Sequence, residues 1–181
     1  MFSSSALLVI DLQPIFTDSI KDTEYQGRVQ RTLSFMRQQL PAAHIVHIRA
    51  NYAGTPMRTR SGDLNPTRAV PSDSIGTSWA VELPGEPVVT KSTINGFHKT
   101  ELEEYLKGLG VSTLYCMGML TAACVHSTAV GGMNRGFECV LVEEACIDKT
   151  PERQAQVFSL FKDYLYQTIT MEELMGNGPT V

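Results

Sequence analysis

The chain has 181 residues, of which 43% are hydrophobic and 19% are charged, a composition typical of one globular domain. Its net charge of −4 and its scattered basic residues, of which Arg58, Arg60 and Arg68 are the nearest to a cluster, argue against a nucleic-acid partner. Because no apolar stretch approaches ~20 residues and the N-terminus lacks the features of a signal peptide, we expect a single cytoplasmic domain over 1–181 with no membrane partner, although release by a non-classical route stays open.

Short apolar runs alternate with helical periodicity along the chain. In order, they predict a strand at 6–10, a helix at 25–40, strands at 45–48 and 88–90, a helix at 100–108, a strand at 113–117, a helix at 122–135, a strand at 138–142, a helix at 152–164 and a strand at 167–170. The polar segment 50–86 has little periodic pattern, which is typical of a functional or covering loop. This alternation predicts an α/β fold with a mostly parallel sheet and helices on both faces.

Capping signals predict where two of the helices begin. Thr100 and Glu103 have the spacing of a capping box, and Thr121 is a candidate N-cap for the helix after the fourth strand. Cys124 then lies in the first turn of that helix, where unpaired N–H groups and the helix dipole favour thiolate over thiol. The alternative is an inert cysteine in the core.

Three reactive residues follow predicted strands. Asp11 comes after the first strand, Lys91 after the third and Cys124 after the fourth. Such an Asp can also be a helix cap, and such a Lys a solvated surface charge. However, the carboxyl ends of parallel strands meet at one edge of a sheet, where sites gather. A carboxylate base, a cation and a thiol at that edge indicate acyl transfer through a cysteine nucleophile.

The same residues lie within segments that match a known family. The chain resembles the isochorismatase-like cysteine hydrolases from residue 6 to about residue 172. The segments that carry this resemblance, in order, are LVIDLQ (8–13), EPVVTK (86–91), Phe97, TEL (100–102) with Leu106 and Gly110–Val111, GMLTAACV (118–125), Thr128–Ala129 and Gly136.

The resemblance implies a three-layer, Rossmann-like fold with a six-stranded, mostly parallel sheet, often in homo-oligomers. It also implies a small-molecule substrate and an Asp–Lys–Cys catalytic triad, here Asp11, Lys91 and Cys124. In the family the oxyanion hole is made by two backbone N–H groups, here those of Leu120 and Cys124, with a cis peptide bond at Met119–Leu120.

The chemistry of such a site can be stated for this chain. The Cys124 sulfur attacks a carbonyl carbon while Asp11 takes the thiol proton and hands it to the leaving amine. Lys91 is expected to lower the pKa of both neighbours. Water then releases the acyl group, so the predicted reaction is amide hydrolysis through a thioester.

Five further residues are candidates for the substrate pocket. Gln13 and Phe16 follow Asp11 closely, and Phe97 matches an aromatic residue of the family's pocket, although either Phe can be core packing. Trp79 lies in the long loop and can wall the site. Arg49 can pair with a substrate carboxylate through its planar fork, or it can be an exposed charge.

We expect no metal and no cofactor. The nicotinamidase branch of the family has an Asp-x-His metal motif after its second strand, where this chain reads Arg49-Ala50-Asn51-Tyr52. The four cysteines have no zinc-ligand spacing, and outside Cys124 we expect them to be buried and inert: Cys116, Cys139 and Cys146.

Three functions remain open at this point. The favoured one is a cysteine amidase that acts on a small carboxamide. An isochorismatase, which cleaves a vinyl ether with Asp11 as the acid and without a nucleophilic thiol, is the alternative. Family members with that activity often lack the cysteine, so Cys124 favours the amide. The third is a catalytically silent binding or assembly module.

Overall fold

The computed structural model describes residues 2–18, 20–52 and 79–176. In chain order these form β1 (Ser5–Ile10), α1 (Pro14–Thr17), α2 (Tyr25–Gln39), η1 (Ala42–His44), β2 (Ile45–Ala50), β3 (Val88–Lys91), α3 (Leu102–Gly108), β4 (Thr113–Met119), η3 (Thr121–Val125), α4 (His126–Met133), β5 (Glu138–Ile147), α5 (Pro151–Phe161), β6 (Gln167–Ile169) and α6 (Met171–Gly176). Arg58, Arg60 and Arg68, like most of the predicted loop 50–86, lie outside the described residues.

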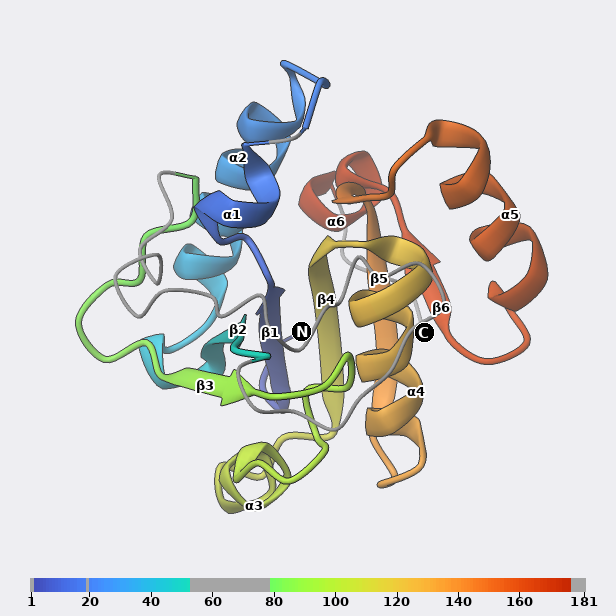
Figure 1. Ribbon diagram of the computed structural model, residues 1–181. Coiled ribbons are helices and arrows are strands. Elements are labelled where there is room, and N and C mark those ends of the chain that lie inside the picture. Colours follow the sequence, from blue (N-terminus) through green and yellow to red (C-terminus); the bar gives the residue numbers. More distant parts are fainter. Residues whose placement is uncertain (1, 19, 53–78, 177–181) are drawn as a thin grey trace.

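The strands form one six-stranded sheet in the order β3-β2-β1-β4-β5-β6, and every neighbouring pair is parallel (Figure 1). All six strands of this sheet were predicted, and the predicted α/β fold class is confirmed. The main difference in length is β5, which continues to Ile147 rather than ending at Val142.

Helices and apolar clusters cover both faces of the sheet. Along β1, Ala6, Leu8 and Ile10 point into one buried cluster, whereas Leu7 and Val9 point into the other. The first cluster contains residues of α3 and α4, and the second contains residues of α2 and α6. A continuous apolar strand is expected in a sheet that is buried on both faces, so β1 needs no polar alternation.

The chain order changes direction between β1 and β4. From β1 the sheet grows outward through β2 to β3, and the chain then returns to the other side of β1 to form β4, β5 and β6. This arrangement leaves a switch point at the carboxyl ends of β1 and β4, which is where open α/β sheets bind their ligands.

Glycine is required where these two strands approach each other. Gly118 of β4 has φ +125, and a Cβ atom built there would stand 2.0 Å from the carbonyl oxygen of Ile10. The pairing of β4 with β5 shifts register between Cys116 and Gly118, so the end of β4 is irregular just before the turn that carries Cys124.

Both predicted helix starts are wrong in detail. α3 begins at Leu102 with Glu101 as its N-cap, which makes no side-chain cap. The Thr100 hydroxyl donates to the Gly96 carbonyl at 2.6 Å and accepts only a long bond, at 3.5 Å, from the Leu102 N–H. Thr121 is the first residue of the π-helical turn η3 and not its N-cap. Cys124 therefore lies in a π turn that precedes α4, not in the first turn of a regular α-helix.

Among the residues that the structure describes, none forms a helix long and apolar enough to cross a bilayer.

A buried carboxylate connects α2, β2 and the segment before β3. Glu86 accepts two hydrogen bonds from Arg37, at 2.7 and 2.8 Å, and lies 2.8 Å from His47 Nε2. Burial alone would raise the pKa of Glu86, but Arg37, the Leu83 N–H and His47 outweigh it and lower the pKa to about 2. The network therefore stabilises the ionised form of Glu86 in the folded state.

We expect Glu86→Ala to lower the free energy of unfolding by about 3 kcal/mol at neutral pH, because Arg37 and buried His47 lose their partner. Since the pKa of Glu86 is about 2 in the fold and 4.5 ordinarily, this contribution is present above pH 4.5 and is lost as the pH falls toward 2. Urea unfolding followed by the fluorescence of Trp79, the only tryptophan, measures both effects.

The matched control is Glu103→Ala, because the Glu103 carboxylate binds Lys107 and Arg135 on the surface. Glu103→Ala should lower the free energy of unfolding by less than about 1 kcal/mol. If both variants lowered the free energy of unfolding equally, the buried network of Glu86 would not be a special source of stability.

Candidate active site

The structure brings Asp11, Lys91 and Cys124 together at the switch point. The Lys91 ammonium donates to Asp11 Oδ2 at 2.8 Å and to Cys124 Sγ at 3.5 Å. All three residues are buried, with Lys91 fully inaccessible to solvent. The three predicted residues thus form one cluster, although they are far apart along the chain.

Local backbone structure explains how these side chains meet. Asp11 follows β1 with φ 55, and its N–H donates to the carbonyl of Ile48 on β2 at 2.9 Å. Lys91 ends β3, which is separated from β1 by β2. Its register partner on β2 is Ala50, and its ammonium reaches Asp11, which follows β1.

The turn that carries Cys124 is held by its own backbone and by one carboxylate. The Leu120 carbonyl accepts from the N–H groups of Ala123 and Val125, at 3.0 and 3.2 Å. The Ala122 N–H donates to Asp148 Oδ2 at 2.6 Å. The peptide bond between Met119 and Leu120 is cis, as predicted. The use of the Leu120 and Cys124 N–H groups as an oxyanion hole stays a prediction.

Tyr52 is a member of the cluster that sequence reasoning did not select. Its hydroxyl lies 3.5 Å from Cys124 Sγ and 3.2 Å from Lys91 Nζ. The Lys91 ammonium also stands 5.3 Å from the centre of the Tyr52 ring. Tyr52 follows β2 by two residues, so the rule that selected Asp11 and Cys124, proximity to the end of a parallel strand, could have identified it.

The predicted thiolate at Cys124 is wrong for the resting site. Burial and the negative charge of Asp11 raise the pKa of Cys124 to about 12, and the opposing effect of Lys91 does not reverse this. For Lys91, burial lowers the pKa, but Asp11 and Cys124 outweigh it and raise the pKa overall. The site therefore holds a neutral thiol beside an ammonium and a carboxylate, and a base must remove the thiol proton during reaction.

Two predicted pocket residues already have partners in the protein. The Gln13 amide bonds both backbone groups of Ala50, donating to its carbonyl at 3.1 Å and accepting from its N–H at 2.7 Å. Gln13 thus fixes the end of β2. Arg49 is buried and forms an ion pair with Glu82. A substrate carboxylate would have to compete with Glu82 for this guanidinium.

The three aromatic candidates lie in apolar packing. Phe97 is buried and stacks on Phe137, with ring centres 5.8 Å apart. Phe16 and Trp79 pack against the apolar cluster of α2, and the Trp79 ring stands 5.9 Å from that of Tyr25. Their contact with substrate stays a prediction.

The histidines near the second strand have protein partners. His44 Nδ1 lies 2.8 Å from the Ser5 carbonyl oxygen, and His47 Nε2 lies 2.8 Å from Glu86. Within residues 2–18, 20–52 and 79–176, no three His, Cys, Asp or Glu side chains are grouped as metal ligands would be. Cys116, Cys139 and Cys146 are buried, as predicted.

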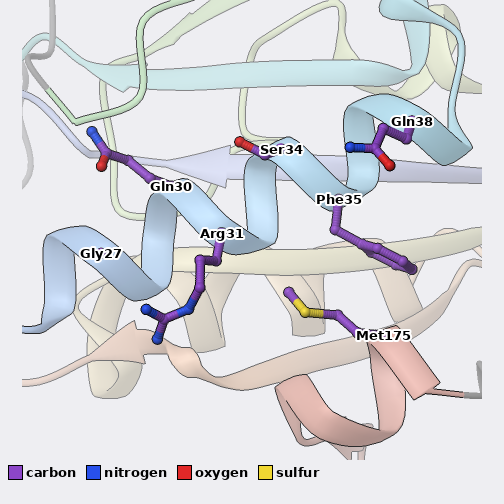
Figure 2. A pocket seen from close by; sticks show the side chains of 7 residues that line it. All are labelled: Gly27, Gln30, Arg31, Ser34, Phe35, Gln38 and Met175. Carbon is purple, nitrogen blue, oxygen red and sulfur yellow. The ribbon is translucent and has the colours of Figure 1, made fainter.

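A surface groove lies elsewhere on the molecule. A hollow of about 480 Å³ is lined by residues of α2 and by Met175 of α6. Figure 2 shows these residues from close by. None of the predicted site residues lines this hollow, so it is not part of the candidate active site.

Comparisons with known proteins agree with the resemblance. A family model described as "Isochorismatase domain" matches residues 5–173. A streptothricin hydrolase of Streptomyces noursei is 30% identical over 148 residues, which are 77% of this chain and 53% of that protein. A maleamate amidohydrolase of Pseudomonas putida is 31% identical over 81 residues, which are 44% of this chain and 38% of that protein. The chain thus spans about half or less of the length of these two relatives.

Solved structures share the fold. An isochorismatase-like hydrolase from Alkaliphilus metalliredigens superposes with a TM-score of 0.79 at 22% identity, covering 95% of this chain and 97% of that one. At this level of identity the likeness extends to the fold alone.

Proposed function

The chain belongs to the isochorismatase family and is a hydrolase of that family, and from this premise we propose that it hydrolyses the C–N bond of a small carboxamide through a thioester on Cys124. The contact of Lys91 with both Asp11 and Cys124 carries the proposal, because it joins a base, a cation and a nucleophile in one buried cluster. Relatives named as hydrolases and amidohydrolases support the reaction class.

The first half of the reaction forms the thioester. Asp11 takes the proton of the Cys124 thiol while the sulfur bonds to the carbonyl carbon, and the negative charge moves to the carbonyl oxygen. The N–H groups of Leu120 and Cys124 are the proposed donors to that oxygen. The C–N bond then breaks, and the nitrogen leaves as an amine with the proton that Asp11 held.

The second half returns the site to its starting state. Water attacks the thioester carbon and gives a proton to Asp11, and the C–S bond breaks. Cys124 recovers its proton from Asp11, and the acid product leaves. Asp11 thus accepts one proton and returns it in each half of the reaction.

Lys91 supplies the positive charge that lets a buried carboxylate act as a base. A carboxylate without solvent or a counter-charge would take up a proton and cease to be a base. The Lys91 ammonium supplies that counter-charge at 2.8 Å from Asp11 Oδ2, and it also donates to the sulfur, where negative charge develops. Lys91 therefore balances charge and does not transfer the proton in this proposal.

The test is a turnover screen of small carboxamides and of isochorismate, run on the parent protein and on Cys124→Ala. We expect amide turnover by the parent protein only, with an acyl group on the Cys124 peptide after rapid acid quench and mass spectrometry. Cys139→Ala is the matched control, since Cys139 is a buried cysteine that donates to the Ala129 carbonyl at 3.3 Å.

Two results would contradict the proposal. Isochorismate turnover that persists in Cys124→Ala, with no amide turned over by the parent protein, would favour vinyl ether chemistry with Asp11 as acid. No turnover of any substrate class, together with no acyl group on the Cys124 peptide after exposure to the screened amides, would favour a silent binding module.

A further inference from the structure

The hydroxyl of Tyr52 has no role in the proposed reaction of Asp11, Lys91 and Cys124. This oxygen lies 3.5 Å from Cys124 Sγ and 3.2 Å from Lys91 Nζ, and the residue is only 3% exposed. A buried hydroxyl in contact with a reacting sulfur is either a space-filling group or a hydrogen-bond donor to that sulfur.

The hydrogen bonds of Lys91 decide between these two. An ammonium has three protons, and the three acceptors around Lys91 are Asp11 Oδ2, Tyr52 Oη and Cys124 Sγ. Because the Tyr52 oxygen accepts from Lys91, its own proton is directed away from the ammonium. The Cys124 sulfur is the other hydrogen-bond contact of this hydroxyl among the described residues, at 3.5 Å, so we assign Tyr52 as the donor in that contact.

The sulfur thus receives donors from two sides. With Lys91 and Tyr52 both donating to it, the thiol proton points to a third direction. Asp11 Oδ1 is buried and has no hydrogen-bond partner among the described residues, so it is free to receive that proton. This unpaired oxygen belongs to the residue that is proposed as the base for the thiol proton.

We propose that Tyr52 is a catalytic residue that donates its hydroxyl hydrogen bond to the Cys124 sulfur and stabilises the thiolate as the thiol proton passes to Asp11. The inference rests on the proposed role of Cys124 as nucleophile. It assigns the sulfur two donors, one charged and one neutral, that act when the S–H bond breaks and again when the C–S bond breaks.

The surroundings of Tyr52 suit a donor and not a base. Burial raises the pKa of Tyr52, with further increases from Asp11 and Cys124, so the phenol keeps its proton throughout the working pH range. The Tyr52 ring makes a separate cation–π contact with Lys91, whose ammonium stands 5.3 Å from the ring centre. A change to Phe therefore removes the donor and keeps the ring beside the ammonium.

The experiment compares Tyr52→Phe with the parent protein by two measurements. The first is the rate at which iodoacetamide alkylates Cys124, followed on the Cys124 peptide by mass spectrometry from pH 7 to pH 9. The second is kcat and KM for the best amide from the screen. Tyr105→Phe is the matched control, because its hydroxyl donates to the Ala43 carbonyl at 2.8 Å, away from the cluster.

We expect alkylation of Tyr52→Phe to be about 3–10-fold slower at each pH, since a less stabilised thiolate forms less often but is intrinsically more nucleophilic. We expect kcat to fall about 10-fold with KM unchanged, and Tyr105→Phe to match the parent protein in both measurements. Thermal unfolding of each variant verifies that the fold is intact.

A change of less than threefold in alkylation would overturn the proposal, whatever happens to turnover. In that case a rise in KM would identify Tyr52 as a wall of the pocket. Because alkylation needs no amide substrate, the inference can be tested even if the screen finds no amidase activity. Slower alkylation of Tyr52→Phe with no amide turned over by the parent protein would support the inference and count against the proposed function.

Discussion

Amide hydrolysis should fall by about 10⁴-fold or more in kcat when Cys124 is replaced by Ala, because the variant has no atom that can form the thioester. The remaining N–H groups and the Asp11–Lys91 pair can still bind substrate, so KM should change little. Steady-state kinetics on the best carboxamide from the screen measures both quantities, and the acyl group on the Cys124 peptide should disappear.

Cys124→Ser provides the stricter comparison. It keeps a nucleophilic atom, but a serine hydroxyl is a far weaker acid than a thiol, and Asp11 is a weak base for it. We expect the serine variant to lose nearly as much activity as the alanine variant. Cys124 is 6% exposed, and the smaller side chains should leave the thermal unfolding midpoint within a few degrees of the parent protein. A variant that folds and keeps more than a tenth of the parent kcat would remove Cys124 from the mechanism.

The sequence was sufficient to find the edge of the sheet where the cluster forms. Asp11, Lys91 and Cys124 each follow an apolar strand, and in a parallel sheet the ends of these strands converge whatever the loops between them do. The two-sided burial of β1 was equally readable, because its residues are apolar without interruption. These features depend on local pattern and on one rule of topology.

Properties that depend on several distant residues at once could not be predicted. The pKa of Cys124 illustrates this point, since placement near the start of a helix suggested a thiolate. The fold buries the sulfur beside the charge of Asp11, and both effects raise the pKa. A local dipole argument cannot include the desolvation that tertiary packing imposes.

The pocket predictions had a related weakness. Gln13 and Arg49 are polar residues near the site, and nothing in the sequence reveals that their hydrogen bonds go to Ala50 and Glu82. Tyr52 lies at the start of a long polar segment without periodicity, where no sequence pattern marks it as part of a site. Its place two residues after β2 is the one available signal. A tyrosine at that place does not by itself indicate catalysis, because its contacts with Lys91 and Cys124 are visible only in the fold.

Asp11→Asn should separate the two properties of the site that Asp11 controls. Hydrolysis should fall about 10³-fold in kcat/KM, because an amide cannot accept the thiol proton or return it to the leaving amine. Alkylation of Cys124 by iodoacetamide at neutral pH should become faster, because the negative charge that helps to raise the pKa of Cys124 is gone. Few substitutions increase the reactivity of a nucleophile while removing catalysis, so the combination is diagnostic.

A second variant is needed to separate the loss of catalysis from a loss of folding stability, because Asp11→Asn leaves Lys91 buried without its counter-charge. Breaking such a pair costs about 3–5 kcal/mol, whereas replacing both members by uncharged side chains of similar size costs much less. Asp11→Asn with Lys91→Met should therefore unfold near the parent temperature, remain inactive, and lose the accelerated alkylation, since no cation is left beside the sulfur. Glu103→Gln, which removes an exposed carboxylate, should change neither the rate of amide hydrolysis nor the rate of Cys124 alkylation. If Asp11→Asn hydrolysed amides within tenfold of the parent protein, another base would have to take the thiol proton, and the mechanism built on this cluster would fail.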